Sequence, residues 1–413
     1  MSRIVAFCFL FIAAVVADVR MDAQPAWSTF KPPFGAIAPL DSEEIPGAVK
    51  GDSFKSHAVG VPQDDWLPDT GALSVHASSL IALNDGNIRA FWFAGTREGA
   101  ADVVIVSAVF DSKSRLWGAP TTVIDRVGAE RGLSRYIAKL GNPVPARMAD
   151  GRLQLFFVTV SMGGWAGSSI STMISDDEGV TWSKPERLIT SPLMNISTLV
   201  KSPSVQFADG RLGLPAYHEW IGRFGEFLRI EGSQVIDLRR MSAGRGTIQP
   251  VVLLQSNESA SAYFRQTRGA QQLKQIPVSQ TTDAGQSWQS APDLDIANPN
   301  SAVSMVTLND GVQLMAANNI ETGRYRLVLM MNDGHGGRWH PIQILEDDES
   351  LPNDQRREFS YPYLISTNGS DAHLVYTWNR KRIRHIYFDG AWIEQAKIQL
   401  TTPVTKSLEQ GVQ

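Results

Sequence analysis

Short apolar segments with alternating hydrophobic and polar positions recur along the chain, in pairs separated by a polar turn. Five of the turns contain Asp-Gly or Asn-Gly and the sixth contains Ser-Asn-Glu-Ser. The turns centre on Gly86, Gly151, Gly210, Asn257, Gly311 and Gly369, at steps of 65, 59, 47, 54 and 58 residues. Because Asp-Gly and Asn-Gly accept the positive φ of tight hairpin turns, the pattern predicts a series of β-hairpins.

A second series, of tryptophans, follows the first in the same register. The tryptophans are Trp117, Trp182, Trp288, Trp339 and Trp392, at spacings of 65, 106, 51 and 53 residues. The long interval corresponds to two units from which one tryptophan is missing. Two series in one register predict six units of about fifty residues without long helices. We therefore predict an all-β fold, a six-bladed β-propeller, with a pair of β-sandwiches as the alternative.

Composition adds limits to this picture. A chain of 413 residues accommodates either one repetitive fold or two to three domains. Its formal net charge of −4 gives no general attraction to nucleic acid or to anionic membranes. The only cysteine, Cys8, lies in the N-terminal segment, so the rest of the chain has no thiol and no disulfide. Stability must then come from packing.

The N-terminus has the parts of a secretory signal. Arg3 precedes the apolar run from Ile4 to Val16, and Val15-Val16-Ala17 resembles a cleavage site. The run is too short to span a bilayer, and no later segment replaces it. We predict a signal peptide over residues 1–17, an extension or linker over 18–65 and the propeller over 66–413. The mature protein is expected to be exported, to a periplasm or out of the cell, without an integral membrane segment.

The segment "SDDEGVTW" (175–182) looks like a cluster of catalytic carboxylates, but "TTDAGQSW" (281–288) repeats its pattern. A catalytic cluster is needed once, whereas a turn is needed in each blade. Asp177 can accept backbone N–H groups, Gly179 permits a tight turn, and Trp182 can pack between sheets. The segment is therefore predicted to be a turn.

These features resemble the Asp-box (bacterial neuraminidase repeat) family from about Ala72 to Asp389. A sialidase-like branch is indicated by "HASSLIALNDG", "GTREGAADV", "NPNSAVSMVTLNDG", "FSYPYLI" and "YTWNRKRIRH". The resemblance implies a site with arginines that hold a substrate carboxylate, a tyrosine nucleophile assisted by a glutamate, and an aspartate that acts as acid and base. Arginine suits this task because its planar fork binds carboxylate through two hydrogen bonds.

Five residues match the positions that the resemblance implies. Tyr361 would be the nucleophile and Asp102 the acid/base, and Arg97, Arg265 and Arg326 would bind the substrate carboxylate. Local register leaves Arg324 as a competitor of Arg326, and Arg268 as a competitor of Arg265.

Two positions depart from the family pattern. His76 stands where the first clamp arginine is expected, and Gln249 stands where the glutamate beside the nucleophile is expected. Glutamine cannot take a proton as a carboxylate does, so Glu219 is the candidate for that task. A buried, hydrogen-bonded histidine is the ordinary interpretation of His76, and near-neutral proton transfer is the functional one.

Three functional hypotheses remain open at this stage. The first is an exo-sialidase type of glycoside hydrolase acting on a terminal carboxylate-bearing sugar of an acidic glycan or sialoglycoconjugate. The second is a polysaccharide lyase that uses His76 and Tyr361 on uronate-containing glycans. The third is a glycan-binding propeller without catalysis. No cofactor and no metal site are expected, because the seven histidines are scattered, and no nucleic-acid partner is expected.

Overall fold

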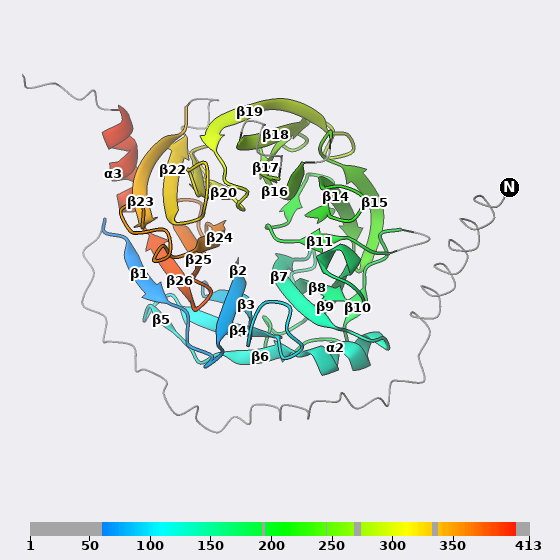
Figure 1. The fold of residues 1–413 in the computed structure, drawn as a ribbon. Helices are drawn as coiled ribbons and strands as arrows, with labels where there is room; N and C mark the ends of the chain where they lie inside the picture. The colour runs from blue at the N-terminus through cyan, green and yellow to red at the C-terminus, as the bar shows by residue number, and fades with distance from the viewer. Residues whose placement is uncertain (1–59, 192–194, 245, 268–273, 333–337, 402–413) are drawn as a thin grey trace, which may run out of the picture.

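The computed structural model describes residues 60–191, 195–244, 246–267, 274–332 and 338–401, and it shows six sheets arranged around an axis (Figure 1). The predicted six-bladed propeller is confirmed. The predicted signal peptide and most of the predicted extension lie outside the described residues. No helix in the described ranges is long and apolar enough to cross a membrane.

The blades follow one another along the chain, and each is an antiparallel sheet. Blade one contains β2 (Ser74–Ala82), β3 (Ile88–Gly95), β4 (Val104–Asp111), β5 (Leu116–Trp117) and β6 (Thr121–Ile124). Blade two contains β7 (Lys139–Arg147), β8 (Leu153–Val160), β9 (Ser168–Ser175) and β10 (Glu186–Arg187). Blade three contains β11 (Leu199–Val200), β12 (Val205–Gln206), β13 (Leu212–His218), β14 (Phe224–Glu231) and β15 (Gln234–Arg240).

The second half of the ring repeats this arrangement. Blade four contains β16 (Thr247–Leu254), β17 (Ala260–Gln266), β18 (Gln275–Thr281) and β19 (Gln289–Ala297). Blade five contains β20 (Ser304–Thr307), β21 (Gln313–Ala317), β22 (Arg326–Asn332) and β23 (His340–Asp347). Blade six contains β24 (Phe359–Ile365), β25 (Ala372–Trp378), β26 (Arg382–Phe388) and, as its outer strand, β1 (Gln63–Trp66).

Strand β1 closes the ring. It pairs antiparallel with β26, with Gln63 opposite Tyr387 and Trp66 opposite Arg384. The last blade therefore combines strands from both ends of the propeller, and β1 crosses the predicted boundary between 65 and 66. Backbone pairing at this position joins the first segment of the fold to the last.

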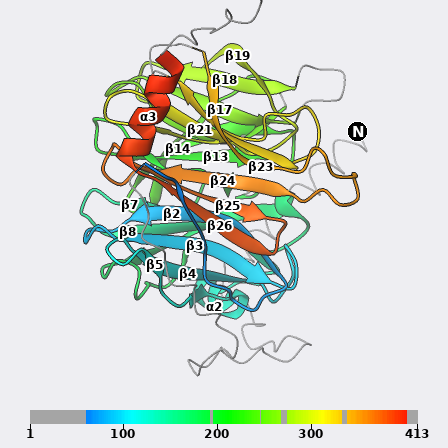
Figure 2. The same cartoon turned by 90° about the vertical axis from the view of Figure 1, so that its left-hand side faces the viewer.

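The described part of the chain has few helices, and they lie outside the strands. Helix α2 (Arg126–Leu133) begins at Asp125, whose carboxylate accepts the N–H of Gly128 at 2.6 Å, and the short η2 (Trp165–Gly167) precedes β9. Helix α3 (Gly390–Thr401) lies along the outside of the last two blades and buries Ile393 and Ala396 there (Figure 2).

The apolar core is distributed around the ring rather than collected in one place. In the described part of the chain it forms six clusters, one at each interface between neighbouring blades. The strands therefore bury both faces, as the runs of buried residues in β3 and β8 show. Each blade is stable because its neighbours cover it, which is the physical basis of a repeat architecture.

Five of the predicted turns join the first and second strands of a blade, and the turn at Gly210 joins β12 to β13, which both β11 and β12 pair with. The five turn glycines have φ between 74° and 89°. The predicted hairpins are thus confirmed, and the turns lie together at one end of the propeller.

The two segments with the Ser/Thr-x-Asp-x-Gly-x-Ser/Thr-Trp pattern form the same hydrogen-bonded turn. The Asp177 carboxylate accepts the N–H and the hydroxyl of Thr181 at 2.8 and 2.6 Å, and the indole N–H of Trp182 donates to the Gly179 carbonyl at 3.1 Å. The corresponding contacts of Asp283 with Ser287 measure 2.8 and 2.5 Å. Every carboxylate oxygen in these bonds serves the turn, as the sequence predicts.

We expect Asp283→Ala to lower the free energy of unfolding by about 1–3 kcal/mol, because several N–H and O–H groups of the turn lose their acceptor. The effect should be confined to stability, because the carboxylate serves only the turn. Chemical denaturation measures the effect, with Asp176→Ala as the matched control, since its side chain is 82% exposed. Equal destabilisation by both variants would contradict the assigned role.

Candidate functional site

The first strands of the blades share a backbone feature near the propeller axis. A residue other than glycine has positive φ in or just before each first strand, and these residues are Ala77, Asn142, Ser197, Gln249, Asn300 and Tyr361. At four of them the strand pairing shifts register, which is the mark of a β-bulge. A bulge breaks the alternation of side chains and redirects one of them. Such φ values in bulky residues cost roughly 1–3 kcal/mol and are concentrated at functional sites.

Tyr361 lies at the bulge of β24 with φ of 56°. Its half-exposed side chain accepts a hydrogen bond from Nε2 of Gln249 at 2.9 Å through the phenolic oxygen. The nearest tyrosine on the same strand, Tyr363, is instead 1% exposed and packs between blades. The bulge therefore separates a tyrosine that faces the axial end from one that belongs to the core.

Gln249 connects three side chains. Its Oε1 accepts a hydrogen bond from Nη1 of Arg265 at 3.1 Å, and its Nε2 faces the hydroxyls of Tyr361 and Tyr217, the latter at 3.3 Å. A guanidinium only donates, so the amide oxygen must face Arg265 and the amide nitrogen must donate to both tyrosines. Gln249 therefore stabilises negative charge on the phenolic oxygen of Tyr361, although it cannot accept that oxygen's proton.

Two asparagines extend this network. Nε of Arg265 donates to Oδ1 of Asn300 at 2.7 Å, and Nδ2 of Asn142 donates to the Tyr217 hydroxyl at 3.3 Å. We call these six residues (Asn142, Tyr217, Gln249, Arg265, Asn300 and Tyr361) the axial site. Blades two, three, four and six contribute to it directly, and Asn300 precedes the first strand of blade five.

His76 contributes from blade one. Its ring centroid lies 4.2 Å from that of Tyr361, and its Nδ1 is 2.9 Å from the Thr377 hydroxyl. The side chain is 1% exposed, and its Nε2 finds no hydrogen-bond partner in the described part of the chain. Burial, together with the charge of Arg380, keeps the pKa of His76 well below its usual value. His76 is therefore a neutral imidazole that packs on the tyrosine.

Lys201 reaches across the ring from blade three to blade six. Its Nζ donates to the carbonyl oxygen of Pro362 and lies 5.8 and 5.6 Å from the ring centroids of Tyr361 and Tyr363. The residue is 4% exposed. Burial, and secondarily the charge of Arg265, lowers the pKa of Lys201 to about 7. A cation placed here holds the backbone next to Tyr361.

We expect Lys201 to make stability depend on alkaline pH. Its pKa falls from 10.5 in the unfolded chain to about 7 in the fold, so the unfolded state binds more protons between these values. The free energy of unfolding should therefore rise with pH above about 7, by at most about 1.4 kcal/mol per pH unit. Urea unfolding of the wild type and of Lys201→Met at a series of pH values between these limits measures this difference. Identical slopes for the two proteins would refute it.

Arginines and carboxylates surround the axial site in pairs. Glu358 accepts hydrogen bonds from Arg324 and Arg380, both at 3.0 Å, and Arg380 also pairs with Glu98. Burial raises the pKa of Glu358, but the hydrogen bonds from Arg380 and Ser360 outweigh it and lower the pKa to about 2. Arg324 and Arg380 are thus neutralised by neighbours.

Arg265 differs from these paired arginines. Its hydrogen-bond partners are the neutral side chains of Gln249 and Asn300, and no ion pair to it is found among the described residues. Its half-exposed guanidinium has N–H groups left for a ligand. It is therefore the natural anchor for an anion at the axial site.

Glu219 lies beside this group, just after β13. Burial raises the pKa of its carboxyl group, while the charges of Arg265 and Arg223 lower it and that of Glu98 raises it. A carboxyl with a raised pKa is suited to proton transfer. In the part of the chain that the structure describes, however, its carboxylate makes no hydrogen bond to Tyr361.

One predicted residue, Arg326, lies away from the axial site. Arg326 points to the outer strand β23, where it pairs with Asp347 at 3.4 Å and Glu349 at 3.2 Å. Its competitor Arg324 is the one that reaches the axial site, through a hydrogen bond to the Asn300 carbonyl at 3.0 Å. The choice of Arg326 is corrected accordingly, because Arg324 lies in the loop before β22 and can turn inward.

The loop after β3 contains two predicted site residues, Arg97 and Asp102. Arg97 is exposed, and the carboxylate of Asp102 accepts the N–H and the hydroxyl of Thr96 at 2.9 and 3.0 Å. The residue of this loop that forms an ion pair with the last blade is Glu98, which pairs with Arg380, and not Arg97. Asp102 remains at the same end of the propeller as Tyr361, with its oxygens engaged by the loop. Arg268 lies outside the described residues.

The sequence contained a signal for the residues that were not predicted. Proline follows the bulged residue in three first strands, at Asn142-Pro143, Gln249-Pro250 and Tyr361-Pro362. Proline inside a sheet is largely confined to edges and bulges, since it lacks an N–H. The recurrence of a proline at this position of the first strand would have identified Asn142 as a residue of the axial site. Tyr217 and Lys201 have no comparable signal.

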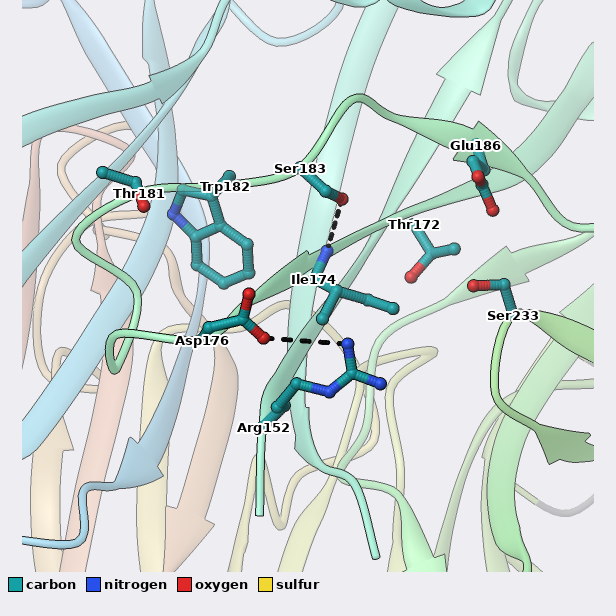
Figure 3. A pocket seen from close by; sticks show the side chains of 9 residues that line it. All are labelled: Arg152, Thr172, Ile174, Asp176, Thr181, Trp182, Ser183, Glu186 and Ser233. Atoms are coloured by element: carbon teal, nitrogen blue, oxygen red, sulfur yellow. Dashed lines mark hydrogen bonds and ion pairs between the residues drawn. The ribbon is translucent and has the colours of Figure 1, made fainter. Parts of the chain in front are cut away.

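The structure also has a surface hollow of about 400 Å³ beside the first turn motif, at the end of β9 (Figure 3). Arg152, Asp176 and Trp182 line it, and Arg152 and Asp176 face each other at 3.7 Å. Since β9 begins at the axial-site end, this hollow lies towards the other end. In the described ranges, no group of three or more His, Cys, Asp or Glu side chains could hold a metal ion.

Comparisons with known proteins agree with this architecture. The family model described as a BNR repeat-like domain matches residues 86–374. Among the curated proteins, none matches significantly. The solved structures with a similar fold include a Hadza microbial sialidase, Hz136, at 14% identity and a TM-score of 0.63, covering 77% of this chain and 66% of that chain.

Two further similar structures come from other organisms. The intramolecular trans-sialidase of Ruminococcus gnavus matches at 14% identity and a TM-score of 0.60, over 78% of this chain and 96% of that chain. The α-L-arabinanase of Penicillium chrysogenum matches at 15% identity and a TM-score of 0.53, over 76% and 93%. At these identities the likeness establishes the fold, and the different activities named show that the fold alone does not fix the reaction.

Proposed function

Since the chain belongs to the BNR repeat-like domain family, we propose that it is a glycoside hydrolase that releases a terminal carboxylate-bearing sugar in the manner of an exo-sialidase. The observation that carries the proposal is the placement of Tyr361. It lies on a backbone bulge with its hydroxyl 2.9 Å from the amide of Gln249, which Arg265 orients. A phenol near an arginine that has no carboxylate partner among the described residues suits an anionic substrate, because a neutral nucleophile avoids repulsion.

The roles in this reaction follow from the site. Arg265 binds the sugar carboxylate, and the Tyr361 oxygen attacks the anomeric carbon while the glycosidic C–O bond breaks. Asp102 gives a proton to the departing oxygen, and Glu219 takes the Tyr361 proton. Gln249 donates to the phenolic oxygen as its charge develops. Water then attacks the anomeric carbon and gives a proton to Asp102, while the bond to Tyr361 breaks and Glu219 returns its proton to the phenolic oxygen.

A lyase is the second candidate, because His76 and Tyr361 are in ring contact at 4.2 Å and, among the described residues, no carboxylate is hydrogen-bonded to the tyrosine. In that reaction neutral His76 removes the proton next to a uronate carboxylate. The electron pair forms a C=C bond and expels the glycosidic oxygen, which takes the proton of Tyr361. His76→Ala would then slow turnover more than Asp102→Ala, the reverse of the order under hydrolysis.

Export forms part of the proposal. Arg3 and the apolar run that follows it support a secretory signal. The proposed substrate is therefore an acidic glycan outside the cytoplasm.

The deciding experiment is mass spectrometry of products after incubation with sialylated and uronate-containing glycans. A released acidic sugar that carries the elements of water is the expected result. A product with a new double bond, one water lighter, would replace hydrolysis by elimination. Binding without any product would favour a glycan-binding propeller and overturn both enzymatic proposals.

A further inference from the structure

A cavity of about 460 Å³ lies next to the axial site, between the loop before β22 and the loop before β24. Its lining includes Thr322, Arg324, Tyr325, Asn353, Arg356 and Glu358. We call it the side cavity. Its volume falls in the range of about 300–1,000 Å³ that is typical of small-molecule sites.

The side cavity and the axial site share a wall. Arg324 lines the cavity and donates to the carbonyl of Asn300 at 3.0 Å, and the side chain of Asn300 accepts from Arg265 at 2.7 Å. One residue, Asn300, therefore separates the guanidinium groups that face the two spaces.

The three arginines that line the side cavity have different partners. Arg324 pairs with Glu358 at 3.0 Å, and Nε and Nη2 of Arg357 donate to the buried carboxylate of Asp348 at 2.8 and 2.5 Å. Arg356 donates only to the backbone carbonyls of Leu351 and Glu349, at 2.9 and 2.7 Å, within the described residues. The positive charge of the cavity that no carboxylate neutralises is therefore that of Arg356.

Arg356 is also held in place. Its guanidinium carbon lies 4.2 Å from the ring centroid of Tyr325, which keeps the planar group against the cavity wall. The two backbone hydrogen bonds fix its orientation and leave three of its five N–H groups unused. A pre-oriented fork of this kind matches a carboxylate.

We propose that the side cavity binds the carboxylate of a second acidic sugar, the one next to the terminal sugar at the axial site. The inference rests on the proposed function for the identity of the terminal sugar. It makes the preferred substrate an acidic oligosaccharide with carboxylates on neighbouring units, rather than a glycan with one terminal acid on a neutral chain.

The test compares ligands with one and two acidic units. Titration calorimetry measures Kd for a methyl sialoside and α2,8-linked disialic acid, and for a methyl galacturonoside and digalacturonic acid. The protein carries Tyr361→Phe throughout, so that turnover does not consume the ligands. In one of the two pairs, sialic or galacturonic, the ligand with two acidic units should bind roughly tenfold more tightly than the ligand with one.

Two variants locate that gain. Arg356→Gln removes the charge, and Thr322→Trp fills the cavity from an exposed position without removing a contact of the loop. Both should abolish the tenfold gain and leave the one-unit Kd unchanged. Arg239→Gln is the matched control, because this arginine is 51% exposed on the outer strand β15 and pairs with Asp237.

The outcomes separate the two proposals. A gain that is absent, or that survives both variants, overturns the side-cavity proposal while one-unit binding that depends on Arg265 still supports the axial site. A gain that is lost in Arg356→Gln, together with one-unit binding that Arg265→Lys leaves unchanged, supports the side cavity and overturns the axial assignment. Failure of all four ligands to bind overturns both.

Discussion

Tyr361→Phe is expected to lower kcat on the order of 10³-fold or more, with KM changed by no more than about threefold. The substitution removes only the phenolic oxygen, so the ring stays against His76, at a centroid distance of 4.2 Å, and under Lys201. Gln249 loses one acceptor but keeps Arg265 and Tyr217. The loss would therefore report chemistry rather than folding. Initial rates with an acidic glycoside that the wild type cleaves measure it.

The matched control is Tyr363→Phe, two residues along the same strand. Tyr363 is 1% exposed and packs between the last and first blades. Its loss should leave kcat within about twofold and affect stability only. A Tyr361→Phe enzyme that keeps a tenth or more of the wild-type rate would refute the nucleophile assignment.

Much of the architecture could be predicted from local sequence. Turn glycines with positive φ and tryptophans in register are short-range features, and they repeat because every blade needs them. The same spacing places His76, Gln249 and Tyr361 on first strands and Arg265 on a second strand, where the structure has them. These positions follow from the repeat alone.

Side-chain contacts between different blades could not be predicted from the sequence. Arg324 and Arg326 lie two residues apart, and alternation gives no reason to prefer the one in the loop over the one in the strand. Lys201 meets Pro362 although 161 residues separate them. Its buried position contradicts the usual exposure of lysine, so no pattern in the sequence marks it. The bulges that direct side chains to the axis are set by pairing with the second strand.

Arg265→Lys should reduce kcat/KM by roughly 10²-fold, about 2.7 kcal/mol at 25 °C. A lysine keeps the charge but loses the fork, which donates to Asn300 at 2.7 Å and Gln249 at 3.1 Å while leaving N–H groups for a substrate carboxylate. The effect should reach both constants: KM rises because the carboxylate loses its partner, and kcat falls because Gln249 is no longer oriented towards Tyr361. Steady-state kinetics over a range of substrate concentrations separates them.

Two comparisons make this prediction specific. Arg326→Lys should leave kcat/KM within about threefold, because its side chain pairs with Asp347 and Glu349 on the outer strand. A substrate whose carboxylate is converted to a methyl ester should be cleaved poorly by the wild type, and the gap between wild type and Arg265→Lys should shrink. An undiminished gap would mean that Arg265 acts only through Gln249 and does not hold the substrate's charge. Equal losses in the two arginine variants would show that the anion binds nearer to β22, and the carboxylate anchor would have to be reassigned.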